Sequence, residues 1–143
     1  MKILIGIDTG VKTGYAVAHD LGSGGKLEEV ETLSITQAMD RVKQLAEQYG
    51  KENMKLYIED ARKRTFVTGG REKLQGVGSV KRDALIWEDW CKEQEFHYLM
   101  VEPKANTTKL KADQFKKRTG WTKRTSEHAR DAAMLVVGRF FKI

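Results

Sequence analysis

The residues of this chain best suited to chemistry are carboxylates that follow apolar segments. The apolar run at residues 3–7 leads directly into Asp8, and a second run ends in Glu59 and Asp60. If both runs are strands of an open α/β sheet, these carboxylates lie at the edge where ligands and catalytic groups collect. Carboxylate oxygens are the ligands that Mg²⁺ and Mn²⁺ prefer. The alternative for Asp8 is a turn residue that only reverses the chain.

A third carboxylate, Asp131, is expected on a C-terminal helix that begins after Thr125 or Ser126 and runs to about residue 141. Apolar residues occupy two sides of this helix, which predicts that it is packed on both faces and that Asp131 points inward. An isolated buried carboxylate costs free energy or takes up a proton, and a divalent cation removes that cost. His128 lies one turn earlier on the same side, where it is either a ligand or base or simply a surface residue.

Basic side chains are concentrated in two segments. Residues 62–73 carry five basic side chains against one acidic, and residues 104–124 carry eight against one. These segments therefore hold a net charge of +11, and the rest of the chain holds −5, within a total of +6. Such polarity predicts a face that binds polyphosphate, although a lysine-rich helix exposed only to water is the alternative.

The remaining pattern predicts an α/β chain with five strands and four helices. Residues 3–8, 13–18 and 27–33 have short connections, which predicts an antiparallel meander, while strands at 55–60 and 96–101 follow helical segments and are expected to be parallel to the first. The expected helices span 34–49, 74–92, 107–118 and 125–141. Residues 61–70 carry no apolar period and are expected to form a loop beside the site.

Length and composition limit the remaining possibilities. At 143 residues the chain is expected to form one domain, residues 1–143. The single cysteine, Cys91, excludes an internal disulfide and a cysteine-rich zinc site. No apolar run approaches the length of a membrane span, and the N-terminal run lacks a cleavage pattern, so we expect a soluble, cytoplasmic protein.

The strings Gly6-Ile7-Asp8-Thr9-Gly10, Tyr57-Ile58-Glu59-Asp60 and His128-Ala129-Arg130-Asp131-Ala132-Ala133 resemble the RuvC family of Holliday junction resolvases. These nucleases belong to the ribonuclease H-like superfamily, and the resemblance in element order covers the whole chain. It implies a five-stranded mixed sheet, a three-strand meander plus two parallel strands, flanked by helices. The small size and the Arg130-Asp131-Ala132 string are most similar to phage-type members.

The resemblance also implies a metal site and a substrate. In that family the matching residues bind two divalent cations, here Mg²⁺ or Mn²⁺ held by Asp8, Glu59, His128 and Asp131. We expect Asp8 to bridge the ions, Glu59 and Asp131 to bind one each, and His128 to act as ligand or proton shuttle; Asp60 and Glu127 are reserve candidates. The substrate is branched DNA such as a four-way junction, contacted by basic residues among which we count Arg62, Lys63, Arg64, Arg71, Lys104, Lys109, Lys111, Lys116 and Lys117.

A homodimer follows from the two-fold symmetry of a junction cut in two strands. Ile86 and Trp90 lie off the core stripe of the 74–92 helix, through which similar resolvases pair; the alternative is that both pack under the protein's own loops.

Two other functional classes share parts of this pattern. Gly-Ile-Asp-Thr-Gly also opens the phosphate loop of sugar-kinase and actin-like ATPases, but those proteins need two such domains. A ribonuclease H-like module that binds nucleic acid without cutting it, or that has broader specificity, would keep the basic face.

Overall fold

The computed structural model describes residues 1–22, 24–63 and 71–140, with the side chains of 63, 71–77, 80 and 140 left out. A five-stranded sheet in the order β3-β2-β1-β4-β5 runs through the centre. Its strands are β1 (Lys2–Asp8), β2 (Thr13–Asp20), β3 (Gly25–Leu33), β4 (Met54–Glu59) and β5 (Tyr98–Val101). The pairs β1–β2 and β2–β3 are antiparallel, and β4 is parallel to both β1 and β5, so the predicted meander and two parallel strands are confirmed.

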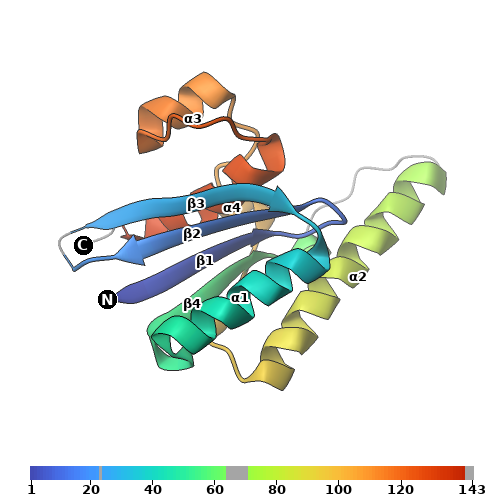
Figure 1. The fold of residues 1–143 in the computed structure, drawn as a ribbon. Helices are drawn as coiled ribbons and strands as arrows, with labels where there is room; N and C mark the ends of the chain where they lie inside the picture. The colour runs from blue at the N-terminus through green and yellow to red at the C-terminus, as the bar shows by residue number, and fades with distance from the viewer. Residues whose placement is uncertain (23, 64–70, 141–143) are drawn as a thin grey trace.

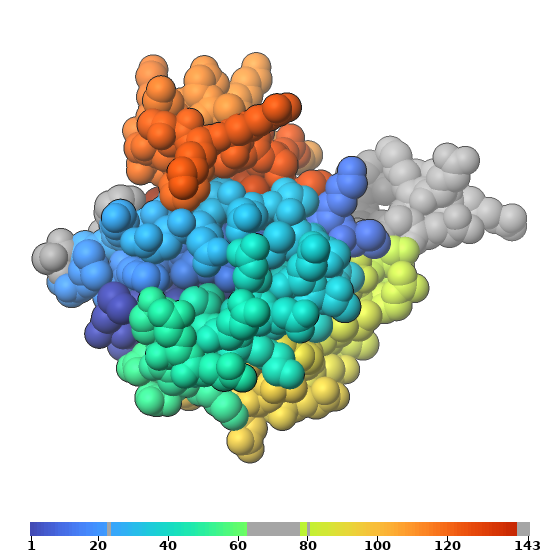
Figure 2. Space-filling model, viewed as in Figure 1, coloured from blue at the N-terminus to red at the C-terminus, as the bar shows by residue number. Residues whose placement is uncertain are grey.

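In the described part of the chain, three helices cover the two faces of this sheet (Figure 1). Helices α1 (Ile35–Tyr49) and α2 (Arg71–Gln94) lie on one face, and α4 (Glu127–Phe140) lies on the other. The short α3 (Ala112–Thr119) and the segments on either side of it stand above the strands as a raised lobe (Figure 2). None of the helices in the described ranges is long and apolar enough to cross a membrane.

Local sequence signals account for the ends of α1. The Ser34 hydroxyl accepts a hydrogen bond from the backbone N–H of Gln37, whose side chain accepts one from the Ser34 N–H. This reciprocal cap satisfies two donors that the first turn would otherwise leave without partners. Gly50, with φ of +88°, ends the helix in a backbone conformation that favours glycine.

Alternation along the strands separates two apolar layers. Ile3, Ile5 and Ile7 of β1 pack with buried side chains of α1 and α2, including Trp87 and Cys91. The opposite face, which holds Leu4, packs against α4. Trp90 was expected off the core stripe, on the surface that pairs with a second copy. It makes edge-to-face contacts with Trp87 and Phe96, so this part of the expected dimer surface packs in the layer that contains Ile3, Ile5 and Ile7.

The approach of α4 to the sheet depends on two glycines. A Cβ added to Gly6 on β1 would lie 2.1 Å from the carbonyl oxygen of Ala132, and one added to Gly14 on β2 would lie 2.0 Å from that of His128. No real Cβ tolerates such distances from backbone, so any other residue at these positions displaces the helix. Small residues on the helix complete the contact, because Ala129 and Ala132 are buried there.

We therefore expect Gly6→Ala to lower the free energy of unfolding by about 3 kcal/mol or more, because the added methyl group overpacks a backbone contact. Urea unfolding followed by circular dichroism measures this change. Gly138→Ala is the matched control on α4, since nothing lies within 4 Å of its added Cβ. The control should raise stability by up to about 1 kcal/mol, because alanine favours a helix interior over glycine. Equal stabilities of Gly6→Ala and wild type would refute the close contact.

Candidate metal and nucleic-acid site

Two of the predicted carboxylates lie side by side at the carboxyl ends of the parallel strands β1 and β4. The register pairs Ile7 with Ile58, so Asp8 and Glu59 follow one step later on neighbouring strands. Both side chains are buried and belong to the strand faces turned toward α4. Asp60, the next residue, points to the other side of the sheet because side chains alternate along the chain.

Helix α4 brings two more predicted residues to the same end of the sheet. Its first turn places Nδ1 of His128 3.1 Å from Oδ2 of Asp8, and Asp131 is buried one turn later. When Asp8 is ionised, its carboxylate can only accept, so this contact requires the tautomer of His128 with a proton on Nδ1. The His128 side chain is 52% exposed, so solvent or substrate has access to the imidazole.

The electrostatics of Asp131 show that the carboxylates influence one another. Burial raises the pKa of Asp131 above its ordinary value, and the charges of Glu59 and Glu127 raise that pKa further. Two contributions lower the pKa of Asp131: the backbone N–H of Lys109, which donates to Oδ1 at 2.8 Å, and the charge of His128. Ionised Asp131 is therefore an unfavourable charge in this environment, and a bound cation would stabilise it.

Residues 106–111 form a non-helical strap over α4, although we expected a helix from 107 to 118. The side chain of Asn106 donates to the carbonyl oxygen of Asp131, and the carbonyl of Leu110 accepts from Nε of Arg130 at 2.7 Å. Lys109 has a φ of +58°, in the left-handed region. The expected helix is wrong over its first five residues because these backbone and side-chain groups bond to α4 instead of to each other.

Asp60 takes part in an ion-pair network on the α2 side of the sheet. Arg62 donates to both carboxylate oxygens of Asp60, at 2.8 and 3.1 Å, and to Glu88 of α2 at 2.9 Å. Glu88 also accepts a hydrogen bond from Tyr98 of β5. These contacts use the Nε and Nη2 donors of Arg62, which gives Arg62 a structural set of partners that the sequence did not reveal.

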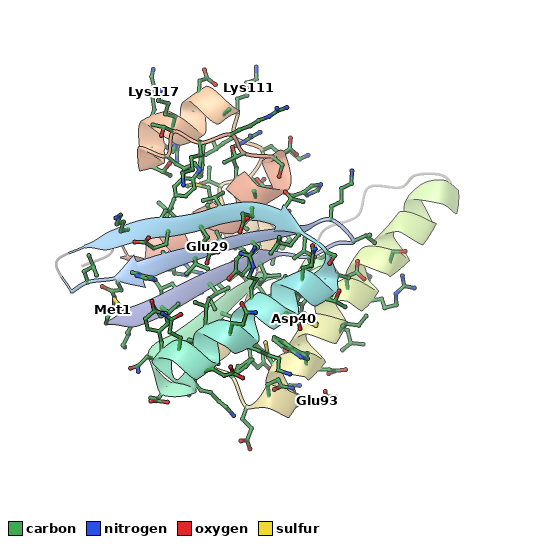
Figure 3. All side chains as sticks on the ribbon, in the orientation of Figure 1. Met1, Glu29, Asp40, Glu93, Lys111 and Lys117 are labelled. Atoms are coloured by element: carbon green, nitrogen blue, oxygen red, sulfur yellow. The ribbon has the colours of Figure 1, made fainter. Side chains whose placement is uncertain are left out.

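The remaining basic residues fall into three groups. Lys109, Lys111, Lys116 and Lys117 are exposed on the strap and on α3, and Figure 3 shows Lys111 and Lys117 extending away from the body of the protein. Lys104 is exposed, with Nζ 3.6 Å from Glu102. Arg64 and the side chains of Lys63 and Arg71 lie outside the described part of the chain.

The donor types at this end of the sheet suit a hard divalent cation, since three carboxylates and an imidazole are present. Within the described ranges, however, no three His, Cys, Asp or Glu side chains are close enough together to hold an ion as they stand. Glu127 begins α4 and is exposed. Four contributors to this site were not predicted: Asn106, the backbone of Lys109 and the two glycines Gly6 and Gly14. Of these, only the glycines carry a sequence signal, because a glycine inside an apolar strand marks a close backbone approach.

Comparison with known proteins identifies the fold. No protein-family model matches the chain, and no curated protein matches it. Among solved structures, the chain is similar to one described as the Thermus thermophilus RuvC structure, with a TM-score of 0.58 and 18% sequence identity. The match covers 97% of this chain and 94% of that one. The chain therefore has the RuvC-type, ribonuclease H-like fold.

Proposed function

We propose that this protein is a metal-dependent endonuclease that cuts four-way junctions or other branched DNA by phosphodiester hydrolysis. The observation that carries the proposal is the placement of three buried carboxylates, Asp8, Glu59 and Asp131, at one end of the sheet, on two strands and one helix of a RuvC-type fold. Exposed lysines of the strap and α3 lie on the same side of the sheet as α4 and supply a surface for the DNA backbone.

In this proposal Asp8, Glu59 and Asp131 would hold two Mg²⁺ or Mn²⁺ ions. Bound there, the ions would supply Lewis-acid stabilisation of the phosphate and a water of lowered pKa. The fit rests on oxygen donors and on the raised pKa of Asp131, which shows that negative charge there lacks full compensation.

His128 has two possible uses in the same site. Its Nδ1 donates to Asp8 and fixes the orientation of that carboxylate, which leaves Nε2 to bind an ion or to move a proton. The N–H of Lys109 holds one oxygen of Asp131 in place. These contacts orient the carboxylates before any substrate arrives.

One observation supports a second candidate, a module that binds branched DNA without cutting it. The described residues contain no preassembled three-ligand group, as such a module would not need one. The two candidates share the basic surface and differ only in whether the carboxylates act, so a cleavage assay separates them.

Asp8→Asn should abolish Mg²⁺-dependent cleavage of a four-way junction while binding stays close to wild type, because lysines rather than Asp8 supply the affinity. Gel assays with labelled junctions measure both. Glu28→Gln, on the exposed part of β3, is the control and should cut normally. A wild type that binds but never cuts with Mg²⁺ or Mn²⁺ would establish the non-cleaving module instead.

Changing Lys116 and Lys117 to Ala should weaken binding to all DNA sequences alike. Each lost phosphate contact should also flatten the dependence of log K on log salt by about 0.9. Lys43→Ala/Lys92→Ala, on exposed positions of α1 and α2, is the matched control. An unchanged slope in the α3 variant would show that its lysines are exposed only to water.

We further propose a two-fold homodimer formed through α2, whose Leu85 and Ile86 are 46% and 41% exposed. Ile86→Glu should convert the dimer to a monomer in sedimentation equilibrium at micromolar concentration, because an unpaired charge in an apolar interface is unfavourable. Leu21→Glu, at a more exposed position (55%) in the β2–β3 connection, should remain dimeric. A wild type that is monomeric both alone and on a junction would refute the dimer.

The proposal also covers organisation and location. We propose one nuclease domain, residues 1–143, acting in the cytoplasm, or in the host cytoplasm if the protein is phage-encoded. Recovery of the protein with the membrane fraction would contradict this location.

A further inference from the structure

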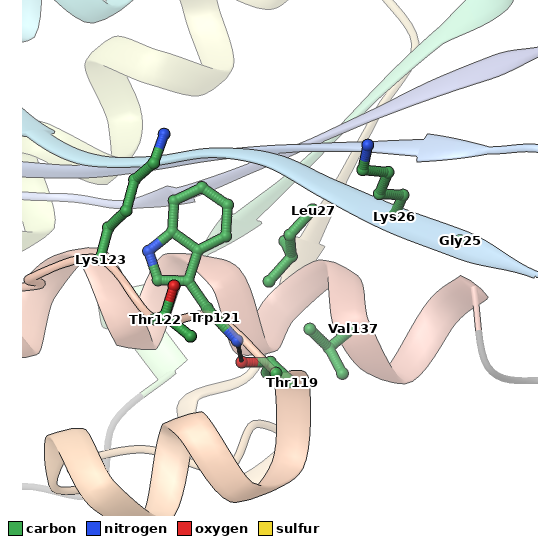
Figure 4. Close-up of a pocket in the computed structure, with 9 residues that line it drawn as sticks. Gly25, Lys26, Leu27, Thr119, Trp121, Thr122, Lys123 and Val137 are labelled. Atoms are coloured by element: carbon green, nitrogen blue, oxygen red, sulfur yellow. Dashed lines mark hydrogen bonds between the residues drawn. The ribbon is translucent and has the colours of Figure 1, made fainter.

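A cavity of about 350 Å³ lies between the start of β3 and the loop that joins α3 to α4 (Figure 4). It is remote from the carboxylates. Gly25, on its wall, pairs with Asp20 of β2, whereas Asp8 pairs with Gly14 at the other end of that strand. Six residues of extended strand span about 20 Å, so this cavity is separate from the proposed metal site.

An anchored tryptophan forms one wall of the cavity. Trp121 is half-buried and packs against the apolar layer around α4. Its backbone N–H donates to Oγ1 of Thr119, the contact drawn in Figure 4. Leu27 and Val137 line the same cavity. The Trp121 ring therefore lies as a flat aromatic surface beside the apolar side chains of Leu27 on β3 and Val137 on α4.

Lys123 supplies positive charge at this cavity. Its Nζ lies 5.6 Å from the centre of the Trp121 ring. Lys26 pairs in register with His19 and its Nζ lies 3.7 Å from Glu28, so its side chain is on the opposite face of β3 from Leu27, as Figure 4 shows. No carboxylate is among the described residues that line the cavity.

We propose that this cavity binds an unpaired nucleotide of single-stranded DNA, with the base on Trp121 and the phosphate held by Lys123. Stacking on an aromatic side chain next to basic groups is how proteins hold single strands without reading their sequence. The bases of a duplex are stacked on each other and offer only their edges, so an aromatic wall selects an unpaired base. If the proposed nuclease function holds, the preferred substrate is branched DNA with one single-stranded arm.

The test uses metal-free, full-length protein and labelled dT₈, with affinity measured by fluorescence anisotropy. Trp121→Leu should weaken binding about tenfold, consistent with loss of one stacked base. Trp121→Phe should retain most of the affinity, because the ring is kept. Lys123→Ala should weaken binding several-fold, while Lys26→Ala, on the other face of β3, and Lys43→Ala should not. Wild-type affinity in Trp121→Leu would overturn the proposal, and so would dTMP binding as tightly as dT₈, since a free nucleotide would then be the ligand.

A second comparison separates this inference from the nuclease proposal. Asp8→Asn should bind dT₈ as wild type does, because the cavity does not use the carboxylates. Wild type should also bind a fork with one single-stranded arm more tightly than a fully duplex fork, and Trp121→Leu should lose that preference. Weak dT₈ binding by wild type would overturn the cavity assignment, whereas lack of cleavage with normal dT₈ binding would overturn only the nuclease function.

Discussion

Helix α4 lies against the strand glycines Gly6 and Gly14. These two backbone contacts determine where His128 and Asp131 lie relative to Asp8. The carbonyl groups of Ala132 and His128 occupy the space that side chains at these glycines would fill. His128 and Asp131 can approach Asp8 only because the helix lies this close to the sheet. A larger residue in either strand would keep the apolar layers and move the helix residues away from Asp8.

The close packing of α4 also places Asp131 where its charge is unfavourable. Burial is the largest cause of its raised pKa, and the charge of Glu59 adds to it. The strap at residues 106–111 gives partial compensation through the N–H of Lys109. On the other side of the sheet, Nε and Nη2 of Arg62 each donate a hydrogen bond to the carboxylate of Asp60, so the negative charge of Asp60 is paired. The contrast between these neighbouring sites explains why a cation is proposed at one and not at the other.

The fold was predictable from sequence because its signals are local. Apolar strands, short connections and the capping residues around Ser34 fixed the element order, which the structure confirms. The sequence could not choose between Glu59 and Asp60, because the choice depends on which face α4 covers. The strap was also out of reach, since its hydrogen bonds connect Asn106, Lys109 and Leu110 to a helix about twenty residues later. The ion pair between Arg62 and Glu88 could not be predicted either, because the two residues are distant in sequence; contact of Arg62 with phosphate stays a prediction.

We propose that Asp8, Glu59 and Asp131 together bind divalent cations once α4 is packed on the sheet. Mn²⁺ titration followed by electron paramagnetic resonance distinguishes bound from free ions, because the two give different signals. We expect two ions per chain in wild type, with binding lost or strongly weakened in Asp131→Asn. If folded wild-type protein bound no Mn²⁺, or if folded Asp131→Asn bound it undiminished, these carboxylates would not form a metal site.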